Sequence, residues 1–342
     1  MGYWPRALNF LEGLSYAHHP VLLQLPQETH KLVDGELVEW NGLRVPLHLD
    51  CNRNWSSQWT RWGCTNYFFA VPTRWTNCQL HEAHVAAKLR AWQPQLPLID
   101  EEYSEHVAVY QAVLRAHARA TAAAGSAAGG GAFVMAELGA RWGTWGARAA
   151  AFLRRLEPKM PYVLHFVESE PMYCEALRQV MQLNSLHFDL DCQMASSKNL
   201  ANWVSKQHHV DVLDLDIQGA ELELLKDLPL LSAIGDKVFR MIIGTHSPDI
   251  QEELRALFKD WLVIYDLPYA KDRDCLRKHF RGAHLGFAVE RSYRKVVDLE
   301  CYNWSPWGRM ANWDGELILD NPKFVRRNHF TMTDTQLVLD LL

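Results

Sequence analysis

Short apolar runs alternate with longer stretches of mixed apolar and polar residues from about residue 131 onward. The runs are residues 132–136, 162–167, 210–215 and 238–243, with weaker examples at 187–194, 262–265 and 317–319. Runs of this kind are typical of strands that are buried on both faces of a parallel sheet. Because helical stretches separate them, the pattern predicts an α/β fold with a doubly wound, mostly parallel sheet.

The stretches between the runs have the apolar spacing of helices. Residues 147–156 and 172–183 are helical in pattern, and upstream so are residues 101–117. Ser247 followed by Pro248 predicts the start of a further helix, because serine caps a helix N-terminus and proline suits the first helical position.

A stretch rich in Ala, Gly and Ser at residues 120–130 is the clearest boundary along the chain. Few side chains there can pack, which is typical of a flexible linker. The sequence therefore predicts an N-terminal region (1–119), a linker (120–130), an α/β domain (131–330) and a C-terminal tail (331–342).

The N-terminal region is smaller than the α/β domain and rich in aromatic residues, among them Trp55, Trp59 and Trp62, with Arg53 and Arg61 nearby. A small aromatic core is the favoured interpretation of this group. The alternative is a stacking surface for a planar or sugar-like substrate or for nucleic-acid bases, so the region's role in substrate binding or interaction stays open.

Composition limits the class of protein. The chain has 342 residues, 48% of them hydrophobic, a formal net charge of −5 and a pI of about 6.3. This balance gives no reason to expect nucleic acid as a partner. No stretch approaches the ~20 apolar residues of a membrane span, and the first residues do not resemble a signal peptide.

The cysteines and histidines suggest neither a disulfide framework nor a metal site. The seven cysteines are widely spaced, with no Cys-x-x-Cys pair, which favours reduced thiols in a soluble, cytoplasmic protein. Cys78, His81 and His84 could gather on one helix, but a zinc site requires a fourth ligand and firmer spacing. The sequence therefore predicts no metal site.

A glycine-containing turn, residues 137–143, lies between a predicted buried strand and a predicted helix. Its glycines allow a ligand to approach the backbone closely, and the N–H groups of the next helix can hold an anion. Glu168 ends the second predicted strand, where a carboxylate can bind both ribose hydroxyls. Together they predict an adenosine cofactor, although separately they could be a simple turn and a solvated acid. The candidate cofactor-binding residues are Glu137, Gly139, Ala140, Arg141, Trp142, Gly143 and Glu168.

The string D-I-Q-G-A-E at residues 216–221 resembles the end of the fourth strand in the FkbM-type methyltransferase family. Residues 137–143, 244–247 and 314–317 resemble other motifs of that family. The resemblance covers about the C-terminal two-thirds and implies a Rossmann-like fold of the class I methyltransferase type. It also implies S-adenosyl-L-methionine as cofactor and a hydroxyl of a small molecule, such as a sugar or polyketide, as methyl acceptor. Two segments depart from the pattern: 184–211, which usually frames the adenine, looks short, and 281–307 looks inserted.

Methyl transfer is an in-line displacement that requires positioning and often a base. His246 and Asp216 end neighbouring predicted strands and are the candidate catalytic residues, with His246 as a base that is neutral near pH 7. An equally weighted alternative is that His246 bonds the helix start at Ser247. Asp216 is also a candidate contact of the cofactor, and Gln218, Glu221 and His246 are candidate substrate contacts. Glu221 could instead simply begin a helix, where acids are favoured.

Two rival functions remain. A nicotinamide-dependent oxidoreductase is disfavoured because the fingerprint G-x-G-x-x-G is missing. A degenerate cofactor-binding module without catalysis is the main alternative, and the short segment 184–211 keeps it open.

Overall fold

The computed structural model describes residues 21, 24, 31–33, 36–46, 103–123, 131–267 and 315–327. The chain divides into two compact units, Met1–Tyr103 with Ala270–Trp313, and Ser104–Tyr269 with Asp314–Leu342. The aromatic group at residues 53–62, the candidate metal ligands at 78–84, the inserted segment 281–307 and the tail 331–342 lie outside the described residues.

A small antiparallel sheet belongs to the first unit. It contains β1 (Lys31–Val33), β2 (Glu36–Val38) and β3 (Arg44–Pro46) in that order. Gly42, at φ +86°, makes the turn between β2 and β3, and its N–H donates to the Glu39 carbonyl at 2.8 Å.

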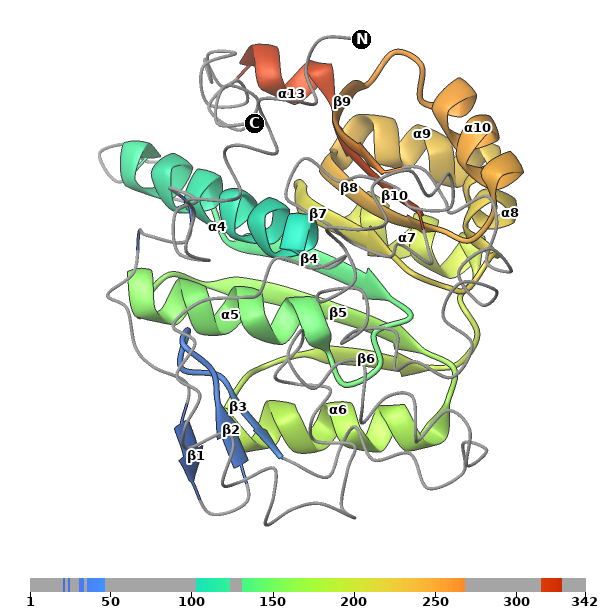
Figure 1. Cartoon of the computed structure of the whole chain (residues 1–342). Helices are drawn as coiled ribbons and strands as arrows, with labels where there is room; N and C mark the ends of the chain where they lie inside the picture. Colours follow the sequence, from blue (N-terminus) through green and yellow to red (C-terminus); the bar gives the residue numbers. More distant parts are fainter. Residues whose placement is uncertain are drawn as a thin grey trace, which may run out of the picture. The chain divides into compact units, whose positions relative to one another are not determined.

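One seven-stranded sheet forms the centre of the second unit (Figure 1), in the order β6-β5-β4-β7-β8-β10-β9. The first five in this order are parallel, whereas β10 is antiparallel to both β8 and β9. The strand order changes direction at β4 and β7, and open sheets of this kind bind ligands at the carboxyl ends of the strands beside such a point. The strands are β4 (Phe133–Leu138), β5 (Tyr162–Glu168), β6 (Asp189–Cys192), β7 (Val210–Leu215), β8 (Val238–Thr245), β9 (Leu262–Leu267) and β10 (Gly315–Asp320).

Helices cover both faces of this sheet (Figure 1). Val134, Ala136 and Leu138 of β4 share one buried cluster with apolar residues of the helices between β6 and β9. Because successive strand residues point to opposite faces, Glu137 points the other way, toward α5. The helices are α4 (Tyr103–Ala123), α5 (Thr144–Leu156), α6 (Pro171–Leu183), α7 (Ser197–Lys206), α8 (Glu221–Leu225), α9 (Leu228–Lys237), α10 (Pro248–Leu257) and α13 (Pro322–Arg327).

Buried ion pairs attach α4 to the sheet. The guanidinium of Arg240, on β8, donates to both carboxylate oxygens of Asp320 at 2.6 and 2.8 Å and to the Ala108 carbonyl of α4 at 2.9 Å. Arg115 of α4 reaches the same carboxylate at 2.9 Å. Burial works to raise the pKa of Asp320, but Arg240 and Arg115 outweigh it and hold this pKa below its usual value.

A second attachment lies further along α4. Arg119 donates to the carboxylate of Asp211 at 2.7 and 3.2 Å, and the Val134 N–H donates to the same carboxylate at 2.9 Å. Burial raises the pKa of Asp211, while His209 and Arg119 lower it by more, so the net shift is downward. Arg119 therefore links α4 to β4 and β7.

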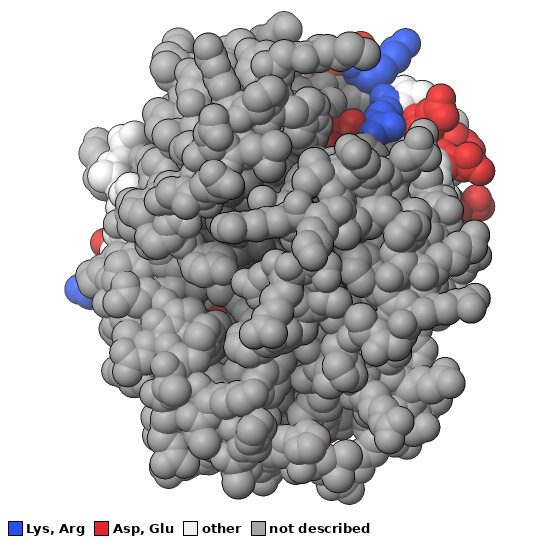
Figure 2. Space-filling model, viewed as in Figure 1, with Lys and Arg blue, Asp and Glu red and all other residues white. Residues whose placement is uncertain are grey.

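The outer helices carry exposed ion pairs. Lys226 beside α8 pairs with Glu253 of α10 at 2.7 Å. On the face drawn in Figure 2, described basic side chains lie beside acidic ones at the upper right, in the region of α10. Exposed pairs contribute little to stability, so these helices are held mainly by their buried apolar residues.

The structure confirms the predicted doubly wound, mostly parallel sheet. The segment 184–211, which looks short in the sequence, contains β6 and α7. α4 extends to Ala123 and includes the first residues of the predicted linker 120–130. The boundary at this linker remains a prediction.

The cysteine prediction is wrong for one pair. Cys174 and Cys192 form a disulfide. Their spacing of 18 residues hides this proximity in the sequence. In the fold, Cys174 lies on α6, the helix that follows β5, and Cys192 of β6 lies opposite Glu168 at the end of β5. Since disulfides persist mainly in oxidising compartments, the cytoplasmic location inferred from reduced thiols loses that support.

Candidate functional site

The turn after β4 requires glycine at its first position. Gly139 has φ +78°, and a Cβ there would lie 1.9 Å from the Asp216 carbonyl oxygen. The Asp216 N–H donates to the Leu138 carbonyl at 2.9 Å, so the ends of β4 and β7 lie in direct contact. The absence of a side chain at Gly139 thus permits the two strand ends to meet.

The Glu137 side chain points toward the first turn of α5 and not toward the contact between the ends of β4 and β7. Its carboxylate accepts the N–H groups of Trp145 and Gly146 in the first turn of α5, at 3.1 and 2.7 Å. Burial raises the pKa of Glu137 to about 8 despite these hydrogen bonds. Burial likewise raises the pKa of Asp214, its neighbour on β7, and the nearby Glu137 raises it further.

This arrangement changes the expected role of the α5 N-terminus. The sequence predicts that its N–H groups are open to an anionic ligand, but those of Trp145 and Gly146 donate to Glu137. The N–H groups of Gly143 and Thr144 donate to the Ala140 carbonyl. A ligand carboxylate would therefore require another source of positive charge.

Glu168 and Arg141 join the ends of β4 and β5. Glu168 accepts the Arg141 N–H at 2.7 Å through one carboxylate oxygen and the Glu170 N–H at 2.8 Å through the other. A carboxylate has about four acceptor positions, so each oxygen can accept one more hydrogen bond. Arg141 has φ +49° and its guanidinium lies 5.7 Å from the centre of the Tyr173 ring.

Most of the predicted cofactor-binding residues, Glu168 among them, are buried, whereas Gly139 and Arg141 are partly exposed. The side chains of Ala140 and Trp142 are buried, and the Trp142 ring packs 5.1 Å from the guanidinium of Arg148 on α5. These two residues can therefore offer a ligand only their backbone. Of the group, Arg141 and Glu168 have the polar side chains at the strand ends.

The D-I-Q-G-A-E segment makes a compact loop between β7 and α8. Gln218 and Gly219 have positive φ, +59° and +103°. The carboxylate of Glu221, fully buried, accepts the N–H of Ile217 at 2.9 Å and that of Gly219 at 3.0 and 3.2 Å. Glu221 thus begins α8, as one of its two interpretations predicts, and also fixes the loop.

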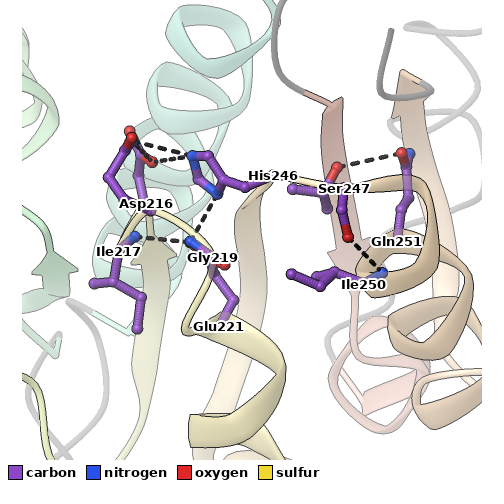
Figure 3. Close-up of polar contacts among 10 residues, drawn as sticks. Asp216, Ile217, Gly219, Glu221, His246, Ser247, Ile250 and Gln251 are labelled. Atoms are coloured by element: carbon purple, nitrogen blue, oxygen red, sulfur yellow. Dashed lines mark hydrogen bonds and ion pairs between the residues drawn. The ribbon is translucent and has the colours of Figure 1, made fainter. Parts of the chain in front are cut away.

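His246 lies between two carboxylates (Figure 3). Its Nε2 is 3.2 Å from the Asp216 carboxylate, and its Nδ1 is 3.0 Å from that of Glu221. Gln218 donates to Asp216 at 3.0 Å, and its side-chain nitrogen lies 3.0 Å from His246 Nε2. The helix start is capped separately, because Ser247 accepts the Ile250 N–H at 3.1 Å.

The carboxylates change the charge of this histidine. Burial lowers the pKa of His246, but Asp216 and Glu221 outweigh burial and raise it to about 10. For Asp216, burial raises the pKa while His246 and Gln218 lower it below its usual value. At neutral pH the ring is therefore an imidazolium in this structure, whereas the sequence-based expectation was a neutral ring.

Sequence reasoning missed three features of the site: the pairing of Glu137 with Asp214, the cation of Arg148 beside Trp142, and the Cys174–Cys192 disulfide next to Glu168. An acid within a buried run, two residues before Asp216, was the available signal for Asp214. Arg148 lies within the predicted helix 147–156 without a pattern that marks it, and no local pattern marked the disulfide.

Comparisons with known proteins found no match among protein-family models or curated proteins. Among solved structures, the chain is similar to a putative RNA methyltransferase from Pyrococcus horikoshii, with 15% identity over 39% of this chain and 60% of that one, and a TM-score of 0.28. It is similar to Aeropyrum pernix fibrillarin with natively bound S-adenosyl-L-methionine, with 11% identity, coverage of 55% and 66%, and a TM-score of 0.32.

A third similar structure is M. capricolum TrmK in complex with S-adenosyl-homocysteine, with 10% identity, coverage of 56% and 62%, and a TM-score of 0.31. The chain thus spans about 60 to 66% of the length of these proteins. At these identities and TM-scores the similarities define no family and no activity for this chain. Among the described residues, no helix is both long and apolar enough to cross a membrane.

Proposed function

We propose that the second unit is an S-adenosyl-L-methionine-dependent methyltransferase that transfers the methyl group to a hydroxyl of a small molecule. The observation that carries this proposal is the junction of Glu168 with the Arg141 N–H at 2.7 Å, which joins the turn after β4 to the end of β5. A carboxylate held beside a glycine turn, next to the point where the strand order reverses, is the arrangement that binds the ribose of an adenosine cofactor.

The chain offers each end of the cofactor a partner. The remaining acceptor positions of Glu168 suit the two ribose hydroxyls. Arg141, rather than the N–H groups of α5, supplies the positive charge for the methionine carboxylate. Asp216 lies at the end of the neighbouring strand and can accept the methionine ammonium group.

Cofactor binding is tested by isothermal titration of the full chain with S-adenosylhomocysteine and with NAD. We expect only the former to bind, and Glu168→Gln to weaken binding by about 10- to 100-fold, since charge-assisted hydrogen bonds contribute about 1.5–3 kcal/mol. Glu170→Gln is the matched control, because this neighbouring acid is exposed and contributes only its N–H to Glu168. Equal affinities of all three proteins would refute the cofactor site.

The acceptor hydroxyl is proposed to lie beside the Asp216–His246 pair, close to Gln218, with Glu221 holding the imidazole from its other edge. In the reaction the S–CH₃ bond breaks as the O–CH₃ bond forms, and the hydroxyl proton leaves toward Asp216. Since the His246 ring is already protonated in this structure, it acts by holding the carboxylate and the acceptor oxygen. The FkbM-type resemblance extends this proposal to sugar or polyketide hydroxyls.

This second part is tested by transfer of a labelled methyl group from S-adenosyl-L-methionine to a panel of hydroxylated sugars and polyketides. We expect Asp216→Ala to lose at least about 100-fold in turnover, in line with the contribution of a positioned proton-transfer group. His246→Ala should also lose turnover, because it no longer holds the Asp216 carboxylate. Unchanged transfer in both variants would remove these residues from the mechanism. If the wild type binds S-adenosylhomocysteine but methylates no hydroxyl in the panel, the non-catalytic module becomes the better description.

A further inference from the structure

The disulfide between Cys174 and Cys192 lies beside Glu168, the acid to which we assign the ribose. Cys174 is near the start of α6, and its Sγ lies 3.5 Å from the Glu168 carbonyl oxygen. Cys192 is the last residue of β6 and lies opposite Glu168 in the parallel pairing of β5 with β6. Both bonded residues are therefore direct neighbours of the Glu168 backbone.

β6 is held less firmly than the inner strands of the sheet. It contains four residues, Asp189–Cys192, and lies at the edge of the seven-stranded sheet, beside β5 (Figure 1). Segments with few buried contacts open locally at a small cost in free energy, and the end of a short edge strand is such a segment. The disulfide ties this end to α6, so it restricts the backbone next to Glu168.

The two bonded cysteines differ in their access to solvent. Cys174 is fully buried, whereas Cys192 is exposed. A thiolate opens a disulfide by attacking one of its sulfurs, so the rate depends on access, and exposed disulfides are the labile ones. Exchange therefore begins at Cys192, with Cys174 as the leaving group.

The fold also accommodates the reduced form of Cys174. A disulfide sulfur carries no proton, so its 3.5 Å approach to the Glu168 carbonyl oxygen is a contact without a hydrogen bond. After reduction the Cys174 thiol, a weak donor, can use this oxygen as its acceptor. A buried thiol otherwise packs as a small apolar group. The surroundings of Cys174 thus suit both redox states.

We propose that Cys174 and Cys192 form a thiol–disulfide exchange site, at which a dithiol reductant weakens cofactor binding at Glu168. A thiolate of the reductant attacks the Cys192 sulfur, and a new S–S bond forms there as the bond to Cys174 breaks. Cys174 leaves as a thiolate and takes a proton, and the second thiol of the reductant then displaces Cys192. Two electrons and two protons pass to the protein, and the reductant becomes a disulfide.

The effect on the cofactor rests on the proposed function. With the bond closed, the ends of β5, β6 and α6 are tied together, and Glu168 is positioned before the ribose arrives. With the bond open, part of this ordering has to occur when the cofactor binds, which weakens binding. The oxidised protein is therefore the form with the higher cofactor affinity.

The exchange is tested by treating the full chain with dithiothreitol in native buffer, followed by alkylation with iodoacetamide and mass spectrometry of the peptides. We expect both Cys174 and Cys192 to become alkylated while the far-UV circular dichroism spectrum stays unchanged. Alkylation of the pair only in denaturant, or unfolding on reduction, would show a purely structural disulfide and overturn the proposal.

Isothermal titration with S-adenosylhomocysteine then compares the oxidised and reduced forms. We expect binding to be about three- to tenfold weaker after reduction, the effect of ordering about one further side chain on binding. The double variant Cys174→Ala, Cys192→Ser should bind like the reduced wild type and should not respond to dithiothreitol. It controls for the remaining cysteines, and the reduced wild type decides the question if this variant does not fold.

Equal affinities of the oxidised and reduced wild type would reject the redox effect and leave the methyltransferase in place. A response to dithiothreitol that persists in the double variant would also reject it, because other thiols would then cause the change. If neither form binds S-adenosylhomocysteine, the proposed function fails and the redox effect fails with it.

Discussion

At the scale of single residues, the close approach of two strand ends sets the strictest requirement on the sequence. Gly139 satisfies it through its positive φ and its missing side chain. The sequence pattern predicts that this glycine belongs to a ligand-binding turn, but it could not show that the neighbour is the Asp216 backbone. A glycine that serves packing and one that serves a ligand look the same in a single sequence.

Gly139→Ala should therefore destabilise the protein whether or not a cofactor binds. A Cβ 1.9 Å from a backbone oxygen forces one strand end to move, and a positive φ adds a cost of about 1 kcal/mol or more. We expect the free energy of unfolding to fall by at least about 2 kcal/mol in urea denaturation.

Gly235→Ala is the matched control for that experiment. Gly235 lies within α9, and a Cβ there would meet no atom within 4 Å. We expect this variant to be as stable as the wild type or more stable by up to about 1 kcal/mol, since alanine favours a helix interior over glycine. Equal losses in the two variants would contradict the tight contact at Gly139.

At the scale of elements, apolar periodicity predicted where the strands lie better than it predicted what the residues at the strand ends contact. β7 occupies the predicted residues 210–215, and Ser247 caps α10 as expected. The sequence predicts that the N–H groups at the start of α5 are open to a ligand. In the structure, two of them donate to Glu137, near the end of the preceding strand. Pairing across the faces of a sheet depends on three-dimensional register, which local patterns do not contain.

Asp320 on β10 provides a test of how α4 is held. Its folded pKa lies below its usual value, so its stabilising effect is complete above the unfolded pKa of about 3.9. The effect is lost as the pH falls toward the folded pKa. We expect the free energy of unfolding of the wild type to decrease from about pH 5 downward, measured by urea denaturation at a series of pH values.

Asp320→Asn should remove part of that acid dependence. At pH 7 it should cost about 3–5 kcal/mol, because Arg240 and Arg115 would remain buried without a carboxylate. Asp236→Asn is the control, since its pair with Lys323 is exposed and should change stability by no more than about 0.5 kcal/mol. An unchanged pH profile in Asp320→Asn would show that other carboxylates cause the acid sensitivity.

At the scale of the whole molecule, composition and order along the chain predicted one α/β domain after residue 131, and the seven-stranded sheet agrees. The same reasoning assigned the helix before the Ala- and Gly-rich stretch to a different domain. In the structure α4 lies in the same compact unit as the sheet, and the domain boundary at the linker stays a prediction. A linker composition indicates where few side chains can pack, but it does not show with which partner the preceding helix packs.

Cleavage at an engineered protease site within residues 124–130 tests how strongly the ion pairs of α4 hold the two fragments together. Arg115 and Arg119 bind Asp320 and Asp211, and α4 buries an apolar stripe. We therefore expect the two fragments to co-elute in size-exclusion chromatography and to separate only in denaturant. In a cleaved Arg115→Ala, Arg119→Ala double variant they should separate at a lower urea concentration, because both ion pairs are absent. The same urea concentration for separation with and without the two arginines would show that their ion pairs do not hold α4 to the sheet, and fragments of the otherwise unmodified chain that separate in native buffer would support a domain boundary at the linker.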